Sequence, residues 1–347
     1  MRGRRFCFIS RAHRALAEAI WTLARTGGYN QTFQYAIRPP LMQVFFGNPR
    51  RFALSPCALT IGNFDGVHRG HQRMLERLRS EADSRQLPAA LLTFEPHPRE
   101  FFARGEPTAR LSTLRDKLAF LRESGLIDYV FVFRFNHGFS GMSAQDFMQH
   151  VLRDALQARY LLIGDDFQFG AGRRGDFAML SSAPWLVTEA MPSVLVEGER
   201  ASSSLVRDRL AAGDLQGAAT LLGRTYQLSG RVVHGKKLGR TIGFPTANVH
   251  LPHRKPALSG VFVVEADTPA GRFGGVASLG RNPTVSQTQD YKLEVHLFDF
   301  AGDLYGRRIV VRFLKKLRDE ARYDDLSALV AQIERDAAEA QTYLTSL

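Results

Sequence analysis

Residues 62–71 read Gly-Asn-Phe-Asp-Gly-Val-His-Arg-Gly-His and join a predicted strand to a predicted helix. The apolar run 58–61 before them is typical of a buried strand, and the apolar residues after them recur at helical spacing. His68 and His71 lie three residues apart at the helix start, so both rings can point the same way beside unpaired backbone N–H groups. This arrangement favours a phosphate group as ligand.

The chemistry that suits such a histidine pair is nucleotidyl transfer. An incoming phosphate attacks the α-phosphorus of a nucleotide, and positioned donors such as His68 and His71 stabilise the charge that gathers on its oxygens. Gly66 and Gly70 let the backbone approach the triphosphate closely. A lone His-x-x-His is more often a surface feature, but the glycines and their neighbours in this turn favour the phosphate site.

This stretch resembles the Gly-x-Phe-Asp-Gly-x-His-x-Gly-His signature of the bacterial bifunctional riboflavin kinase/FAD synthetases. The resemblance implies that His68 and His71 stabilise the transition state. It also implies a set of nucleotide- or phosphate-binding residues in the turn: Gly62, Phe64, Asp65, Gly66 and Gly70.

Composition bounds the class of protein. A chain of 347 residues suggests two domains, and 44% hydrophobic residues can form ordinary cores. No apolar run approaches the length of a membrane span. Cys7 and Cys57 supply neither a disulfide framework nor a Cys-x-x-Cys zinc site, so we expect a cytoplasmic protein.

The positive charge is concentrated at the start of the chain. The formal net charge is +12, and residues 1–41 hold seven arginines against one acid, Glu18. This atypical extension is predicted to be dispensable. The moderate surplus elsewhere suits ATP and flavin phosphates and also permits nucleic-acid binding. No long basic run or interleaved basic and aromatic stripe follows residue 41, so no nucleic-acid partner is expected.

Residues 42–215 are predicted to form an α/β domain with a Rossmann-like parallel sheet. Apolar runs at 89–94, 129–133, 160–164 and 185–187 alternate with helical patterns such as 114–124 and 144–156. That alternation indicates a parallel sheet covered by helices on both faces. Ligands of such sheets bind at the carboxyl ends of the strands, where the His68 and His71 turn would lie.

Two further turns of this domain carry polar groups at strand ends. His97 lies in the proline-rich loop 93–98, where a contact with phosphate or flavin and a role in orienting the loop are equally good interpretations. Residues 164–170 read Gly-Asp-Asp-Phe-Gln-Phe-Gly and are similar to the family's Gly-x-Asp/Asn-Phe-x-Phe-Gly. The resemblance implies that Asp166 binds flavin or nucleotide.

A second oxyanion site is predicted at residues 200–207, Arg-Ala-Ser-Ser-Ser-Leu-Val-Arg. Hydroxyls and a cation at a helix start can hold phosphate. The segment is similar to the family's Ser-Ser-Thr/Ser-x-Val/Ile-Arg motif, with Ala201 where isoleucine is usual. The expected phosphate ligands are Arg200, Ser203, Ser204 and Arg207.

Residues 224–347 are predicted to form a small all-β domain after a boundary near 213–223. Segments 226–233, 260–266, 272–279, 291–297 and 309–313 read as short strands between glycine turns, which suggests a closed antiparallel barrel. A C-terminal helix is expected to start at Asp324 or Asp325.

The barrel domain has its own predicted phosphate segment at 234–248. A glycine loop with cations can close over ATP, and the expected ligands are Gly235, Lys236, Gly239 and Gly243. Thr246 and Asn248 offer hard oxygen ligands suited to Mg²⁺. The segment is not a Walker P-loop, and it closely resembles the riboflavin kinase signature.

The catalytic base of the kinase follows from resemblance. Read alone, the alternation of Lys292, Glu294 and His296 indicates a solvated strand face. The family has Glu-x-His-Leu-x-Asp-Phe here, which implies that Glu294 is the base. Residues 317–320 also follow the family pattern, and Arg318 is assigned to flavin binding. Asn282 departs from the arginine that many members have.

The resemblance therefore implies an enzyme with riboflavin, FMN and ATP as substrates, Mg²⁺ as cofactor, and FMN and FAD as products. Three alternatives remain open. A nucleotidyltransferase for another substrate, such as phosphopantetheine, would have no use for the 243–248 segment. A nucleic-acid-binding protein would bind oligonucleotides with steep salt dependence. In the third alternative, one of the two modules is inactive.

Overall fold

The computed structural model describes residues 41–47, 55–103, 105, 108–235, 239, 242–251, 255–281 and 291–347. These residues belong to one compact unit of the chain. The predicted extension, residues 1–41, lies outside the described residues except for Leu41. No helix among the described residues is long and apolar enough to cross a bilayer.

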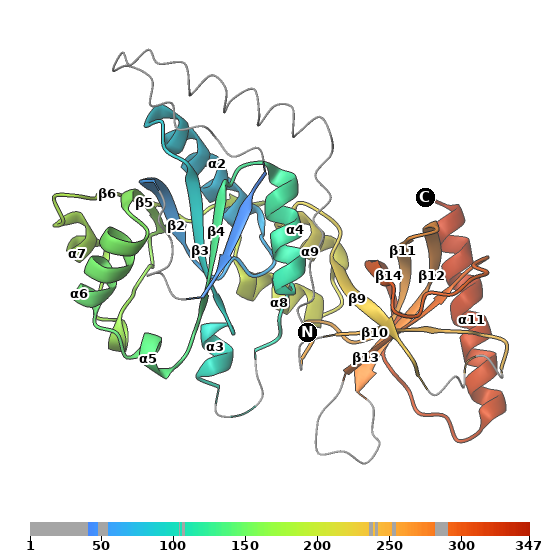
Figure 1. Cartoon of the computed structure of the whole chain (residues 1–347). Helices are drawn as coiled ribbons and strands as arrows, with labels where there is room; N and C mark the ends of the chain where they lie inside the picture. Colours follow the sequence, from blue (N-terminus) through green and yellow to red (C-terminus); the bar gives the residue numbers. More distant parts are fainter. Residues whose placement is uncertain are drawn as a thin grey trace, which may run out of the picture. The chain divides into compact units, whose positions relative to one another are not determined.

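The N-terminal half is a six-stranded parallel sheet in the order β1-β4-β3-β2-β5-β6 (Figure 1). Every residue of the central strand β2 is buried, because helices cover both faces. The strands are β1 (Gln43–Phe46), β2 (Cys57–Ile61), β3 (Ala89–Glu95), β4 (Tyr129–Arg134), β5 (Ala158–Gly164) and β6 (Val187–Met191).

Alternate residues of β2 enter the two cores. Ala58 packs with Leu75 and Leu78 of α2 (Arg69–Ser84) and with α4 (Leu114–Ser124), whereas Leu59 packs with Val151 on the opposite face. The remaining elements of this half are α3 (Pro98–Phe101), α5 (His137–Ser140), α6 (Ala144–Asp146), α7 (Phe177–Ser181), the π-helix η2 (Phe147–Ala155), the 3₁₀ turn η3 (Ala171–Arg173), and the hairpin β7 (Leu195–Val196) with β8 (Glu199–Arg200). The predicted α/β class is confirmed.

Local differences from the sequence prediction occur at the sheet edges. The strand expected at 185–187 begins only at Val187, because Trp185 and Leu186 pack into the core before the edge strand starts. The opposite edge strand β1 was not predicted as a strand. The single helix expected at 144–156 is a short α-helical turn followed by η2.

Two helices lead from the sheet to the second half: α8 (Ser203–Ala211) and α9 (Leu215–Leu222). Gly223 ends α9 in the left-handed conformation at φ 71°, which favours glycine. α9 lies between the predicted domain edges of 215 and 224, which remain predictions.

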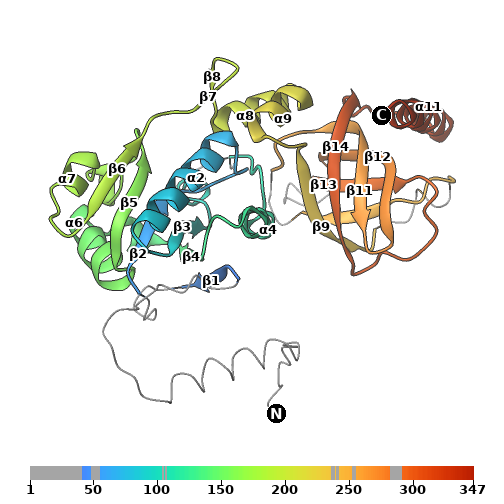
Figure 2. The same ribbon diagram turned by 90° about the horizontal axis from the view of Figure 1, so that it is seen from above.

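The C-terminal half is a closed antiparallel barrel in the order β10-β13-β12-β11-β14-β9 (Figure 2). Leu293, Val295 and Leu297 of β13 are buried in its core, which leaves Glu294 on the opposite face of the strand. Asp325 caps α11 (Leu326–Thr345) by accepting from the Ala328 N–H, as one of the two predicted starts. The strands are β9 (Gln227–Val233), β10 (Ala247–His250), β11 (Gly260–Thr268), β12 (Gly271–Arg281), β13 (Tyr291–Leu297) and β14 (Arg308–Arg318).

Candidate active sites

The turn between β2 and α2 holds two histidine rings in a stack. His68 is the N-cap residue of α2 and makes no side-chain capping bond, so its ring is free for other contacts. The ring centroids of His68 and His71 lie 3.7 Å apart, and His71 stacks on Phe64 at 4.5 Å. Phe64 and Val67 adopt backbone φ angles of 48° and 41°. Residues other than glycine rarely adopt such angles, so the surrounding structure must stabilise this conformation.

Both imidazoles are neutral at neutral pH. Burial lowers the pKa of His68 to about 4, and burial together with the neighbouring His68 lowers the pKa of His71 well below its usual value. The Nδ1 atoms of both rings are buried and have no hydrogen-bond partner among the described residues. A phosphate anion placed beside the rings would satisfy their polar groups and favour their protonated form.

Asp65 fixes this turn to the rest of the domain. Its buried carboxylate accepts hydrogen bonds from the Leu111 and Ser112 N–H groups and forms an ion pair with Arg207 at 2.5 Å. Burial alone raises the pKa of Asp65, but the charges of Arg207 and Lys117 lower it below the usual value. Asp65 and Arg207 were predicted as phosphate ligands. Their charged groups face each other, and the prediction of direct contact with a nucleotide stays a prediction.

A cavity of about 480 Å³ opens beside the histidines at the carboxyl ends of the strands. The start of α8 faces the cavity from the other side, where Ser203 donates to the Asp65 carbonyl at 2.8 Å. Thus two helix N-termini contribute to one cavity. It brings together most of the residues predicted for this half, namely Phe64, His68, Gly70, His71, His97, Asp166, Arg200, Ser203, Ser204 and Arg207.

Two of the three predicted flavin contacts, His97 and Asp166, line this cavity. His97 caps α3 by accepting from the Arg99 N–H at 3.0 Å, and burial lowers its pKa to about 4. Asp166 is exposed and pairs with Arg200 at 2.9 Å. The predicted Gly62 and Gly66 are not among the residues that line the cavity. At Gly66 φ is 79°, and a side chain would collide with Leu111.

Sequence reasoning missed several residues of the cavity. The side-chain amide oxygen of Asn63 is buried without a partner among the described residues, although Asn63 lies inside the quoted turn. Arg99 follows the predicted proline loop directly, which was an available signal. Ser193 is brought in by the end of β6 and carried no signal of its own.

The second site lies on the outer face of the barrel, where strand register aligns the predicted residues. Asn248 of β10 lies directly opposite Glu294 of β13, and Ser278 of β12 lies opposite Glu294 on its other side. Thr246 precedes β10 by one residue. The Mg²⁺ ligands and the base expected from separate motifs are therefore neighbours on one surface.

Glycines of the 234–248 segment make close approaches to this surface. A side chain at Gly235 would collide with the Asn248 amide, and one at Gly239 would collide with the Phe244 carbonyl. The His296 Nδ1 lies 2.9 Å from the Pro245 carbonyl oxygen, which holds the Pro-Thr-Ala-Asn run against β13. Gly243 has φ of 86°. The predicted Lys236 and the divergent Asn282 lie outside the described residues.

Arg318, which was predicted to bind flavin, forms an ion pair within the protein. Its guanidinium forms a two-pronged pair with Asp336 of α11, at 3.0 Å from Nε and 2.7 Å from Nη2. Its assignment to flavin stays a prediction. Glu320, two residues further, accepts from Ser278 at 3.3 Å and so lies near Glu294, a proximity that sequence reasoning did not anticipate.

The described residues contain no cluster of carboxylates and histidines that could ligate a metal ion. No group of three or more His, Cys, Asp or Glu side chains in the described part of the chain could hold a metal ion. The candidate ligands at the barrel are instead the hydroxyl of Thr246 and the amide of Asn248.

Both halves match families of known function. The family model described as FAD synthetase matches residues 51–205, and the one described as riboflavin kinase matches residues 222–344. The bifunctional riboflavin kinase/FMN adenylyltransferase of Haemophilus influenzae is 44% identical over 84% of this chain and 96% of its own length. The protein of the same name from Escherichia coli K12 is 46% identical over 83% of this chain and 92% of its length.

A solved structure shares the fold. The crystal structure titled macrolide-efflux protein from Streptococcus pneumoniae superposes with a TM-score of 0.73 at 27% identity. The match covers 84% of this chain and 97% of that one, so it includes both the sheet and the barrel.

Proposed function

The chain belongs to the bifunctional riboflavin kinase/FMN adenylyltransferase family, and we propose which of its residues carry each reaction. The enzyme transfers the γ-phosphoryl group of ATP to riboflavin, giving FMN and ADP. It then transfers the adenylyl group of a second ATP to FMN, giving FAD and pyrophosphate. The β-barrel carries the first reaction and the parallel-sheet domain the second.

Adenylyl transfer takes place in the cavity at the His68 turn. A phosphate oxygen of FMN attacks the α-phosphorus of ATP, and the bond to the pyrophosphate leaving group breaks. His68 and His71 donate hydrogen bonds to the oxygens that gain charge. Ser203 and Ser204 at the start of α8, and Arg200 at the end of β8, hold the phosphates. The single supporting observation is the pair of stacked, neutral, buried rings with unpartnered Nδ1 atoms at the open start of α2.

Phosphoryl transfer takes place on the barrel face at Glu294. The carboxylate accepts the proton of the riboflavin 5′-hydroxyl as its oxygen attacks the γ-phosphorus, and ADP leaves. Gly235, Gly239 and Gly243 let the 234–248 backbone close on the ATP phosphates. The cross-strand register that places Glu294 beside Asn248 supports this assignment.

Mg²⁺ fits the ligands at this face. Thr246 and Asn248 offer oxygen atoms, and Mg²⁺ typically takes few protein ligands and completes its shell with substrate phosphates and water. The backbone of Gly235, packed on the Asn248 amide, keeps side chains out of this position. When bound, the ion would neutralise charge on the ATP phosphates.

The remaining assignments concern the whole protein. We place it in the cytoplasm, supported by the small number of cysteines, and expect no nucleic-acid partner. The domains are assigned to residues 42–215 and 224–347, and residues 1–41 are proposed to be dispensable. N-terminal peptide mapping of the cellular protein tests the last assignment, and a chain beginning at Met1 would count against it.

Chromatography of flavins tests the two activities together. The purified protein is incubated with riboflavin, MgATP and an oligonucleotide competitor. We expect FMN and then FAD, with no effect of the oligonucleotide and loss of transfer when the metal is chelated. FMN alone would show that the adenylyl site is silent, and no flavin product from folded protein would overturn the proposal.

A further inference from the structure

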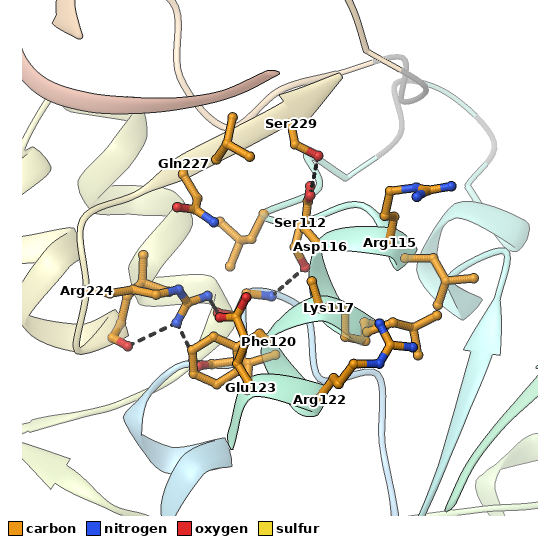
Figure 3. Close-up of a pocket in the computed structure, with 18 of the residues that line it drawn as sticks. Ser112, Arg115, Asp116, Lys117, Phe120, Arg122, Glu123, Arg224, Gln227 and Ser229 are labelled. Atoms are coloured by element: carbon orange, nitrogen blue, oxygen red, sulfur yellow. Dashed lines mark hydrogen bonds between the residues drawn. The ribbon is translucent and has the colours of Figure 1, made fainter. Parts of the chain in front are cut away.

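Arg224 connects the start of the barrel domain to the histidine turn of the other domain. It lies between α9 and β9, and its Nη2 donates to the Gly66 carbonyl at 2.6 Å. Its Nη1 lies 3.2 Å from both the Val67 and the Leu222 carbonyl oxygens. Figure 3 shows this guanidinium beside the Phe120 ring, with 4.2 Å between the guanidinium carbon and the ring centroid.

The hydrogen bonds of Arg224, a partly buried cation, go to uncharged groups. Burial lowers its pKa to about 10, against the opposing effect of Tyr226, Glu123 and Asp116 nearby, and within the described residues Arg224 forms no ion pair with a carboxylate. Its hydrogen-bond acceptors are backbone carbonyls, and its flat face lies on an aromatic ring. Removing part of a charge from water costs free energy that hydrogen bonds to neutral carbonyls offset only in part.

Two of the three carbonyls that Arg224 holds, those of Gly66 and Val67, belong to the turn before His68. Val67 is β-branched and has φ of 41°, and it directly precedes His68. Gln72 adds a second clamp, because its Nε2 donates to the Val67 carbonyl at 2.8 Å and to the Leu222 carbonyl at 2.7 Å. A conformation of this kind persists only where its surroundings over-determine it.

We propose that Arg224 is a positioning residue for adenylyl transfer, which rests on the proposed roles of His68 and His71. By holding the Gly66 and Val67 carbonyls, it sets the direction in which the chain enters α2 and hence the placement of both rings. Arg224 lies within residues 222–344, the segment that matches the riboflavin kinase family. The barrel half therefore supplies a part of the FAD-forming site.

The test compares both reactions in the full-length chain. Arg224→Ala is expected to lower kcat for FAD formation from FMN and MgATP by about 10- to 100-fold, because small misplacements of reacting groups are costly. KM for FMN and ATP should change by less than about threefold, and FMN formation from riboflavin by less than about twofold, since the barrel site keeps all its groups. Arg224→Lys should recover at least about threefold of the lost kcat, because it keeps the charge and one donor.

Two further variants complete the set. Arg122→Ala removes another arginine of the pocket drawn in Figure 3, which Arg224 also lines and which is separate from the cavity at the histidines. Among the described residues Arg122 makes no hydrogen bond to the turn, so both reactions should stay at the wild-type rate. Gln72→Met keeps the side-chain length and removes the second donor. It should lower FAD formation selectively, and it replaces Arg224→Ala should that variant fail to fold.

The outcomes separate this inference from the proposed catalytic roles. FAD formation within twofold of wild type in Arg224→Ala and Gln72→Met, or an equal loss of both reactions, would overturn the positioning role. His71→Ala is measured in parallel. If it retains FAD formation, the proposed histidine roles fail; if it loses FAD formation while Arg224→Ala does not, only the positioning role fails.

Discussion

The two proposed active sites hold their residues in place in different ways. In the parallel-sheet domain, His68 is 6% exposed, its pKa is lowered by burial, and Arg224 donates a hydrogen bond to its turn. At the barrel, Glu294 is partly exposed on a strand, and register with β10 and β12 sets its neighbours. Burial therefore controls the chemistry of the first site, whereas strand pairing controls the second.

This difference teaches where each site is vulnerable. The histidine site depends on distant groups that hold its turn, such as Asp65 and Arg224. The barrel site depends on residues of adjacent strands and on the 234–248 segment. Changes that disturb one site should leave the other intact, and the following variants test that independence.

The largest effect is expected for Glu294→Gln. The amide keeps the shape but cannot accept the proton, so FMN formation should fall by about 10³-fold. FAD formation from added FMN should be unchanged. Both rates are measured by chromatography of the flavins. A comparable fall in FAD formation would show that the sites are not independent.

A smaller loss is expected for His71→Ala. Removal of one transition-state donor should lower FAD formation by about 10²-fold and leave FMN formation unaltered. Accumulation of FMN from riboflavin and MgATP is the expected signature. FAD production at the wild-type rate in this variant would remove His71 from the mechanism.

The buried histidine predicts a pH dependence of stability. Since the pKa of His68 is lowered to about 4 from 6.5, the folded state favours the neutral ring, whereas the unfolded chain takes up a proton near pH 6.5. The contribution of the neutral His68 ring to the free energy of unfolding is therefore complete above pH 6.5 and is lost as the pH falls toward 4. Between pH 7 and pH 5 the loss should be about 2 kcal/mol of unfolding free energy.

Urea titrations of wild type and His68→Gln check this sign. The variant lacks the titrating ring and should lose less stability over the same pH interval. Equal losses in the two proteins would show that the folded state does not disfavour protonation of His68.

The smallest effect is expected at the Arg318 and Asp336 pair. Asp336→Ala leaves the guanidinium unpaired and should destabilise the chain by about 1 to 2 kcal/mol, a value reduced from that of fully buried pairs because Arg318 is partly exposed. Urea unfolding measures this loss. If Arg318 also binds flavin, Arg318→Ala should raise KM for riboflavin more than Asp336→Ala does; equal KM values would limit Arg318 to holding α11.

Much of the fold can be predicted from the sequence, because apolar periodicity and turn chemistry are local properties of the chain. The α/β half, the barrel and most strand positions were predicted from the spacing of apolar residues. Asp325, one of the two predicted helix starts, is the N-cap residue of α11. The motif with His68 and His71 predicts a phosphate site from residue types and spacing, and that site stays a prediction. The short strand β10 was missed because its first two residues lie within the 234–248 motif, which was interpreted for its ligands.

The contacts between side chains that are far apart in the chain are set by tertiary folding alone. It turned the Asp65 carboxylate toward Arg207 and Leu111, and the Arg318 guanidinium toward Asp336. It placed Glu294 opposite Asn248 and brought Arg224 to the carbonyls of a turn more than a hundred residues away. Burial and the direction of a charged group depend on neighbours that folding brings from elsewhere, so no local pattern of residues can encode them.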